Sequence, residues 1–441
     1  MSNLKLFTLS LMFSPALAYA QFAPDWLVAE GIHSVQWHVL GDPQSLTVVP
    51  LGETGSLRLA FDDFYQSTTP FNYTWQHCNR DWQPSGLNHS EAIEGFMESQ
   101  LPDGILSFNT YQPYSHMSTI LPHSDCMPRV SGNYYLIIFG ESQMDTLLKL
   151  PAVFVNQKTQ LSGGIHRTSL MGLRQSHQEI DMIVDMRDIS VLNPFKDVAL
   201  SIIQNRNWRS TKQLAPRFLR NGVMDFDRDD GSNCFPGGNH FRYIDNKNLP
   251  VPSLRVSRYE LNERWVAFVD EEIARGILYP THQQDGQGVF VPRKQGSDDE
   301  GIEADYLWMD LFLKDNEGKG HRQLHVLGDF NAYQPHLDNQ LLYDEIEQAY
   351  RGRIMVKQGY LEYLIADESR SSTDESSQWS ADKIQWSEGN HWETNNRYTV
   401  IVYLRSWGAR HDEAMGMMTL DSRNAMGLKA LELRVGNHQN N

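Results

Sequence analysis

The stretch Tyr73–Leu87, YTWQHCNRDWQPSGL, is the part of the chain that is densest in large aromatic and reactive side chains. It holds three large aromatic rings, a histidine, a cysteine, an aspartate and a proline turn, at Tyr73, Trp75, His77, Cys78, Asp81, Trp82 and Pro84. Aromatic residues followed by a Pro-Ser turn are typical of a β-strand that ends in a turn. Because each aromatic ring can bury about 150–250 Å², the stretch predicts a corner in the core of a β domain.

His77 and Cys78 belong to residue types that bind metals or take part in nucleophilic catalysis. Adjacent residues on a strand point to opposite faces, so these two side chains cannot easily reach one ion or each other. We therefore interpret both as packing residues. The sequence contains no nucleophile elbow, zinc-protease helix, Walker loop or dinucleotide-binding glycine pattern. We predict that the protein is not an enzyme and has no cofactor or metal, and that a small-molecule ligand is not part of its function.

The amino terminus, Met1–Ala20, has a lysine near its start, an apolar run and small residues before Gln21. This pattern is typical of a secretory signal peptide, so we expect an exported protein whose mature chain begins at Gln21. No later stretch has the roughly 20 apolar residues that a membrane helix needs. The sequence therefore predicts a soluble exported protein without a transmembrane segment.

The charge balance is acidic, with 38 Lys and Arg residues against 55 Asp and Glu residues. A negative protein repels phosphate backbones and anionic lipid surfaces. Nucleic acids are therefore not expected as partners. The three cysteines, Cys78, Cys126 and Cys234, lack zinc-type spacing. Two alternatives stay open for them: a Cys78–Cys126 disulfide with Cys234 free, or three buried thiols.

The length of 441 residues is too great for one hydrophobic core and predicts two to four domains. Short strand-like segments separated by turn signals dominate the chain. The predicted fold class is all-β, with tandem immunoglobulin-like β-sandwich domains and few short helices. We expect a first β-sandwich at residues 21–155, a second at 156–301, and a C-terminal immunoglobulin-like domain with a short polar tail at 302–441.

Individual strands can be predicted in all three domains, at Leu57–Phe61, Tyr73–His77, Tyr134–Phe139, Ile180–Met186, Asp197–Gln204, Trp265–Val269, Tyr306–Leu313, Gln323–Leu327, Arg353–Val356, Gly359–Ala366 and Tyr398–Arg405. Ser90–Gln100 predicts about two helical turns, which Gly95 weakens. Asp338–Tyr350 also scores as helical, a choice that the spacing leaves open. Lys294–Gly301 has the composition of a linker, and Ser369–Ser377 that of a mobile loop.

Asp225, Asp227 and Asp229 alternate as at the start of a calcium-binding loop. The sixth position of that loop is Asp230 instead of glycine, and the twelfth is Pro236 instead of glutamate. We therefore interpret the segment as a solvated acidic turn.

Ten ordered blocks of the chain resemble the Plug protein family of the type IX secretion system. They are YTWQHCNRDWQPSGL, SFNTYQPYSHM from Ser107, SGNYYLIIF from Ser131, QEIDMIV from Gln178, NPFKDVALSIIQNRNW from Asn193, CFPGGNHFRYID from Cys234, EADYLWMDLFL from Glu303, GDFNAY from Gly328, VKQGYLEY from Val356 and HWETNNRYTVIVYLRSWGARHDEAMG from His391. The resemblance implies a periplasmic protein without catalytic activity, associated with the outer membrane through a protein partner. That partner is the outer-membrane β-barrel translocon, whose periplasmic mouth such a protein closes.

Within that resemblance, two blocks supply the candidate partner-contact or structural residues: Tyr73, Trp75, His77, Cys78, Asp81, Trp82, Pro84, Asn109, Tyr111, Tyr114 and His116. Two readings stay open for them, a structural corner of the first domain and a contact surface for the partner.

The third region is also similar to the glycogen-binding-like immunoglobulin modules of glucan-active enzymes, through GDFNAY from Gly328 and VKQGYLEY from Val356. Sugar-binding members carry an exposed Trp after the Phe-Asn turn, where this chain has Tyr333. The likeness therefore implies the fold more strongly than sugar binding. It leaves an alternative function, a secreted glycan-binding or glycan-processing module. A glycosidase pair of carboxylates would leave no local pattern to exclude it.

Overall fold

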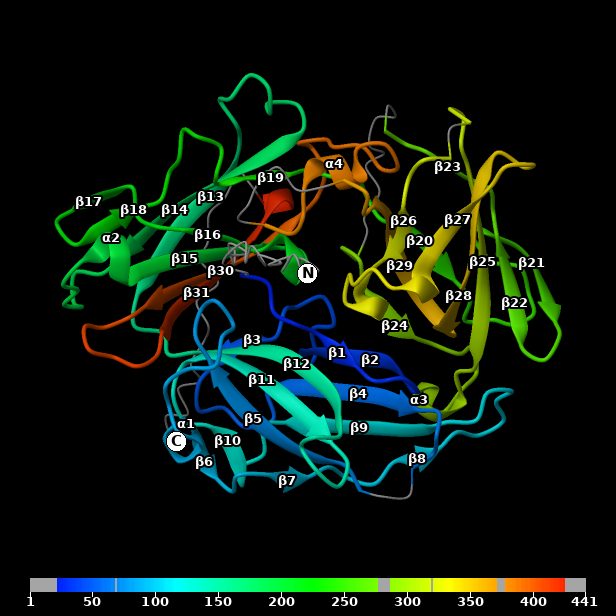
Figure 1. The fold of residues 1–441 in the computed structure, drawn as a ribbon, viewed down its shortest axis with the longest axis horizontal. Coiled ribbons are helices and arrows are strands. Elements are labelled where there is room, and N and C mark those ends of the chain that lie inside the picture. The colour runs from blue at the N-terminus through cyan, green and yellow to red at the C-terminus, as the bar shows by residue number, and fades with distance from the viewer. Residues whose placement is uncertain (1–21, 68–69, 277–285, 319, 371–376, 425–441) are drawn as a thin grey trace, which may run out of the picture.

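The computed structural model describes residues 22–67, 70–276, 286–318, 320–370 and 377–424. Within these ranges the chain is mainly strand, arranged in several sheets with short helices between them. The prediction of an all-β protein built from sandwiches is confirmed. Figure 1 shows three units, the first at the bottom, the second at the upper left and the third at the right. The predicted signal peptide and most of the loop Ser369–Ser377 lie outside the described residues.

The first unit, residues 22–155, packs a sheet in the order β1-β12-β11-β5-β7, with β3 beside β12, against a sheet in the order β2-β4-β9-β8. A small pair, β6 and β10, closes one end. The elements are β1 (Leu27–Val28), β2 (Ile32–Val39), β3 (Val48–Pro50), β4 (Leu57–Asp63), β5 (Asn72–Cys78), α1 (His89–Ala92), β6 (Ile93–Gly95), β7 (Ser99–Gln100), β8 (Ile105–Leu106), β9 (Ser115–Leu121), β10 (Cys126–Pro128), β11 (Gly132–Phe139) and β12 (Thr146–Val155).

The second unit contains two sheets. One has the order β13-β14-β18-β17, with β19 beside β14, and the other has the order β16-β15-β30-β31. Its core joins apolar side chains of β14, β15 and β30. The elements are β13 (Gln160–Arg167), β14 (His177–Asp185), α2 (Pro194–Asp197), β15 (Val198–Gln204), β16 (Lys212–Leu214), β17 (Phe218–Arg220), β18 (Val223–Asp225), β19 (Cys234–Pro236), β30 (Arg397–Leu404) and β31 (Glu413–Asp421).

The third unit is one sheet in the order β20-β29-β26-β27-β28-β25-β22-β21, with β24 beside β29 and β23 beside β25. Ile244 and Val256 lie at opposite ends of this order yet share one core, so the sheet curls over on itself. The elements are β20 (Arg242–Asp245), β21 (Val256–Leu261), β22 (Trp265–Val269), β23 (Glu272–Ile273), β24 (Phe290–Pro292), α3 (Glu300–Glu303), β25 (Tyr306–Lys314), β26 (Leu324–Leu327), β27 (Gln340–Asp344), β28 (Ala349–Lys357), β29 (Gly359–Asp367) and α4 (Ala381–Ile384).

The sheets do not follow the boundaries expected at 156–301 and 302–441. β22, expected in the second domain, lies in the sheet of the third unit. β30, expected in the third domain, pairs with β15 of the second unit, as the neighbouring green and orange-red strands in Figure 1 show. Lys294–Gly301 follows β24 and so lies inside the third unit. A local pattern identifies a strand but not its distant partner, and this is why the expected boundaries differ.

One helix prediction is wrong, and a second segment that the sequence left open is not a helix. In Ser90–Gln100 the helix α1 ends at Ala92, and β6 and β7 follow. Gly95 has φ +93, and a Cβ there would lie 2.1 Å from the Asp125 carbonyl oxygen, so the strand pair requires glycine. Asp338–Tyr350 forms β27, a turn and the start of β28. Sheet pairing here overrides the helical spacing.

Candidate functional site

The strand β5 sorts the residues of Tyr73–Leu87 between two environments. Tyr73 and Trp75 are 0% and 1% exposed and lie in the core between the two sheets of the first unit. Cys78 lies on the opposite face, in a separate apolar cluster. This alternation is the one that strand geometry predicts.

His77 and Cys78 do not form a nucleophile pair. The His77 ring packs edge-on against Tyr134, with ring centroids 4.8 Å apart, whereas Cys78 packs on the face that carries Tyr135. Burial lowers the pKa of His77 to about 4 and raises the pKa of Cys78 to about 12. At neutral pH the imidazole is therefore uncharged and the thiol protonated, which suits packing and not catalysis.

All three cysteines are buried free thiols. Cys78 and Cys126 therefore do not form the disulfide that one of the two alternatives predicted. Burial is the main cause that raises the pKa of Cys126 to about 12 and that of Cys234 to about 11. They act as small apolar side chains.

Trp82 lies between the first and second units. It is 5% exposed, and its ring packs against Tyr135 of the first unit and Trp208 of the second, with centroid distances of 5.1 and 5.4 Å. The shared cluster holds residues of both units: Leu46, Val48, Cys78, Trp82, Tyr135, Val153, Val155, Ile203, Trp208, Ile401, Tyr403 and Ala414. Trp82 therefore joins two sandwiches.

The turn after β5 also binds the second unit. The Arg80 amide donates to the Asp412 carboxylate at 3.0 Å, and the Gly86 amide donates to the Arg410 carbonyl at 3.1 Å. Asp81 is half-buried and accepts a hydrogen bond from the Gln83 amide, while Pro84 is exposed. The turn therefore presents a polar rim around the buried Trp82.

The second block, from Ser107, lies at the junction of the first and third units. The Tyr114 hydroxyl donates to the Ala304 carbonyl at 2.7 Å. His116 Nδ1 lies 2.6 Å from one oxygen of Asp62, and the other oxygen binds Lys357 Nζ at 2.5 Å. Tyr306 donates to the same carboxylate at 2.6 Å.

Asp62 and Lys357 come from different units and are each 1% exposed in their side chains. Burial lowers the pKa of Lys357, while Asp62 opposes that shift. A buried ion pair between units fixes their relative position, because each charge would be uncompensated without the other.

Asn109 and Tyr111 are exposed, as Pro84 is. They lie in the loop that follows the edge strand β8, close in sequence to large apolar side chains that also face solvent. We define the apolar edge as Ile105, Leu106, Phe108 and Tyr111, which are 57%, 63%, 68% and 53% exposed. Exposed apolar side chains gathered on one segment are typical of an interaction surface.

Arg206 joins all three units and was not among the predicted site residues. Its guanidinium donates to the Pro43 and Ser45 carbonyls of the first unit at 2.7 and 2.5 Å. It also binds Asp329 of the third unit at 2.7 Å. Arg206 and Asp329 lie in two blocks that carry the family resemblance, QNRNW and GDFNAY. Those motifs were a signal for this junction, although nothing in the sequence pairs them.

Tyr333, the position of the sugar platform, is 1% exposed and packs with Phe241 and Trp379. Its ring is therefore not available to stack on a glycan. The Arg209 guanidinium of the second unit donates to the Tyr333 carbonyl at 3.0 Å. This turn also serves as a contact between units.

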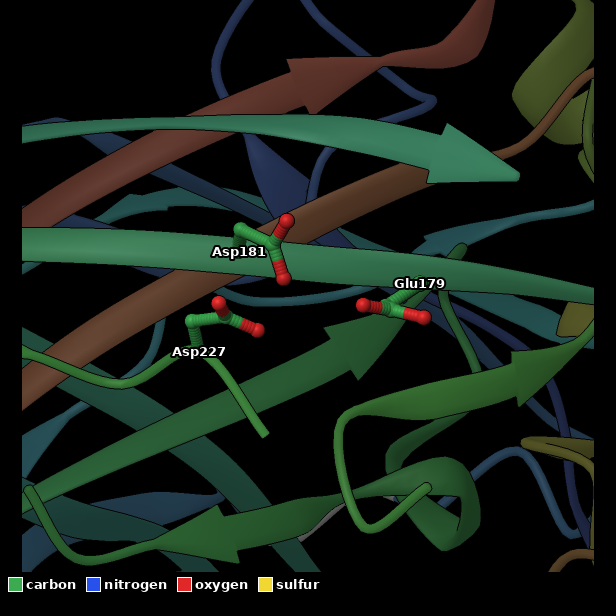
Figure 2. Close-up of side chains that lie close together, drawn as sticks. All are labelled: Glu179, Asp181 and Asp227. Carbon is green, nitrogen blue, oxygen red and sulfur yellow. The ribbon is translucent and has the colours of Figure 1, made fainter. Parts of the chain in front are cut away.

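The three alternating aspartates of the calcium-like pattern do not converge. Asp225 accepts the Asp227 amide at 2.8 Å, and Asp229 pairs with Arg217 at 2.6 Å. Asp227 instead points toward Glu179 and Asp181 of β14, as Figure 2 shows. This grouping could not be predicted from the sequence, because Asp227 is far along the chain from the strand that carries Glu179 and Asp181.

Residues 32–156 match the family model described as the type 9 secretion system plug protein 1st domain. The match covers most of the first unit. It indicates a role in type IX secretion, with a partner in the secretion machinery and a location in the cell envelope. The likeness of the third region to glycogen-binding-like modules is not confirmed.

The fold is similar to that in the crystal structure of a hypothetical protein from Parabacteroides merdae, with a TM-score of 0.82. The two chains are 22% identical, and the similarity covers 91% of this chain and 99% of the other. At this identity the likeness shows the fold alone. No curated protein matches the chain. Within the described ranges, no helix has the length and apolar character needed to cross a membrane.

Proposed function

We propose that this protein is a non-catalytic periplasmic component of the type IX secretion machinery, which binds the outer-membrane β-barrel translocon and plugs its periplasmic opening. The observation that carries the proposal is the match of residues 32–156 to the plug-protein family model. The signal-peptide pattern at the amino terminus supports export, and the family match supports a place in the cell envelope.

A rigid body supports this role. A pore wide enough for folded cargo leaks solutes unless a folded body covers it, and that body must resist deformation. The three units are joined by the apolar cluster around Trp82, by the Asp62–Lys357 ion pair and by Arg206. Packed cores and buried ion pairs of this kind hold units in one arrangement.

The chemistry of the candidate residues also supports a role in binding. His77 and Cys78 have pKa values of about 4 and about 12 because both are buried, and they pack on opposite faces of one strand. A cover needs a shaped surface and no activated nucleophile. We propose that the apolar edge is part of the surface that meets the translocon, since it lies on the unit that matches the family.

Affinity capture from solubilised outer membranes tests the proposal. Tagged wild-type protein should recover a large outer-membrane barrel protein. Ile105→Ser with Phe108→Ser should weaken this recovery, while Leu254→Ser, also at an exposed position at 69%, should leave it unchanged. Recovery of no barrel by the wild-type protein would refute translocon binding.

Cell permeability tests the plugging step separately. Deleting the protein should admit large antibiotics only in cells that retain the translocon. Unchanged permeability in such cells would refute plugging even if binding were observed.

The glycan alternative has less support, because Tyr333 is buried at the position where sugar-binding modules expose a tryptophan. Affinity electrophoresis in soluble starch checks it directly. We expect no retardation, and a clear retardation would favour the glycan-binding module.

A further inference from the structure

Three connections leave the second unit at one end: the loop from β14 to β15, the turn from β17 to β18 and the loop from β30 to β31. The Arg405 amide donates to the Asp197 carbonyl at 2.9 Å, and the Met186 amide donates to the Gly222 carbonyl at 2.9 Å, so the three connections are neighbours. In Figure 1, β17, α2 and the loop between β30 and β31 lie together at the left of the molecule. We call residues 185–197, 220–223 and 405–413 the loop end.

The loop end presents large apolar side chains to solvent. Leu192 is 75% exposed, and Phe195 of α2 is 51% exposed. Trp407, between β30 and β31, is 84% exposed. It lies in a tight turn, because the Ala409 amide donates to the Ser406 carbonyl at 2.9 Å. Exposed apolar side chains that gather in one place mark contacts with proteins or with membranes.

The charges of the loop end balance, although the whole chain has a formal net charge of -17. Its cations are the five residues Arg187, Lys196, Arg220, Arg405 and Arg410, and its carboxylates are the five residues Asp185, Asp188, Asp197, Asp412 and Glu413. At physiological ionic strength, charges elsewhere on the protein are largely screened beyond about 8 Å. The acidic remainder of the chain therefore does little to repel a surface that touches this end.

Two cations of the loop end have no ion pair among the described residues. They are Lys196 and Arg220, and both are exposed. The other three cations are paired, as Arg187–Asp185, Arg405–Asp412 and Arg410–Glu91. Long cationic side chains lay their alkyl stems along apolar surface while their charged heads reach polar groups. Lys196 and Arg220 are therefore available to an anionic group that approaches the exposed rings.

We propose that the loop end contacts a zwitterionic phospholipid bilayer, with Trp407, Phe195 and Leu192 at the depth of the headgroups and Lys196 and Arg220 on lipid phosphates. Tryptophan favours the membrane interface, because its ring is apolar and its N–H is polar. A charge-balanced end meets a bilayer of zero net charge without net repulsion. A protein partner would require a continuous surface of complementary shape, whereas these apolar side chains stand on separate loops.

The bilayer contact lies on a different unit from the apolar edge. The apolar edge belongs to the first unit, and the loop end belongs to the second. The bilayer contact therefore does not depend on translocon binding. If both contacts form, they act together, and the combined affinity exceeds that of either one.

Co-sedimentation of the purified protein with sucrose-loaded vesicles of phosphatidylcholine and phosphatidylethanolamine tests the proposal without a translocon. We expect saturable binding, and a loss of affinity of about tenfold or more when Trp407→Ser is combined with Phe195→Ser. Met171→Ser with Ile346→Ser is the matched control, because these side chains are 89% and 92% exposed and lie outside the loop end. Absence of vesicle binding by the wild-type protein would overturn the proposal, as would equal losses in the two double variants.

A second double variant tests the contact with the headgroups. Lys196→Gln with Arg220→Gln should weaken vesicle binding by about threefold, as expected for the loss of two exposed ion pairs. The apolar side chains are unchanged in this variant, so some binding should persist. An affinity equal to that of the wild-type protein would overturn the contact with lipid phosphates.

Lipids with brominated acyl chains test whether Trp407 itself enters the bilayer, because bromine quenches tryptophan fluorescence only at close range. Wild-type protein should lose more fluorescence on these vesicles than Trp407→Phe, which keeps an aromatic ring at the same position. Equal quenching in the two proteins would overturn the insertion of Trp407. Site-specific cross-linking from position 407 to a protein in intact envelopes, by a chain that binds no vesicles, would assign the loop end to a protein partner and overturn the bilayer contact.

Discussion

Replacing Trp82 with alanine should destabilise the protein strongly, because this side chain fills the junction between the first and second units. Trp82 is 5% exposed. A tryptophan that buries about 150–250 Å² contributes about 4–6 kcal/mol at roughly 25 cal/mol per Å². Measured costs of truncating buried Phe or Trp to Ala are about 3–5 kcal/mol. We therefore expect Trp82→Ala to lower the free energy of unfolding by about 3–5 kcal/mol.

Urea denaturation followed by far-UV circular dichroism measures this change without depending on tryptophan fluorescence. Trp407→Ala is the matched control, since Trp407 is 84% exposed and an exposed substitution should change stability by no more than about 0.5 kcal/mol. A loss below about 1 kcal/mol for Trp82→Ala would refute the structural role of this ring. If the variant also folded normally but failed to capture the translocon, Trp82 would be a contact residue.

Three further predictions concern the junctions and the buried groups. Arg206→Ala should lower the free energy of unfolding by about 3–5 kcal/mol, because it leaves the Asp329 carboxylate unpaired between units. A double-mutant cycle with Asp329→Ala should give a clear coupling energy between the two side chains. Additive effects would contradict the ion pair between units. Burial lowers the pKa of His77 and His177 from 6.5 to about 4, so the chain takes up protons when it unfolds between these pH values. The free energy of unfolding should therefore fall by about 1.4 kcal/mol per pH unit for each histidine as the pH drops from about 6.5 to about 4. His77→Gln should reduce this slope in urea titrations, and an unchanged slope would contradict the lowered pKa of His77. Alkylation without reductant should modify three thiols in denatured protein and almost none in native protein, because all three are buried; intact mass distinguishes this from a disulfide, which would leave one.

The sequence predicted strands far better than their partners. Tyr73–His77 and Tyr134–Phe139 were predicted as strands, and they pair within one sheet. Their aromatic and β-branched residues allow each strand to be predicted from its own sequence. Tyr398–Arg405 was also identified as a strand, yet its partner β15 lies nearly two hundred positions away. Hydrophobic alternation carries no record of such pairing.

The candidate site was predictable to a similar degree. Period-two alternation on β5 correctly separated His77 from Cys78, which excluded a shared chemical role. The same reasoning could not show that Trp82 meets Trp208, or that Asp62 meets Lys357, because each pair forms only when separate units pack. The sequence likewise could not show that Arg206 meets Asp329, although both residues lie in motifs of the family resemblance. The group around Asp181 was missed because Asp227 comes from another segment of the same unit.

We propose that this body closes the translocon, and planar-bilayer conductance of the purified translocon tests that proposal most directly. Adding the wild-type protein to the periplasmic side should abolish the open-channel conductance in a saturable manner. The Ile105→Ser, Phe108→Ser variant should require a higher concentration, while Leu254→Ser should act as the wild-type protein does. Conductance that stays unchanged at saturating wild-type protein would contradict the account.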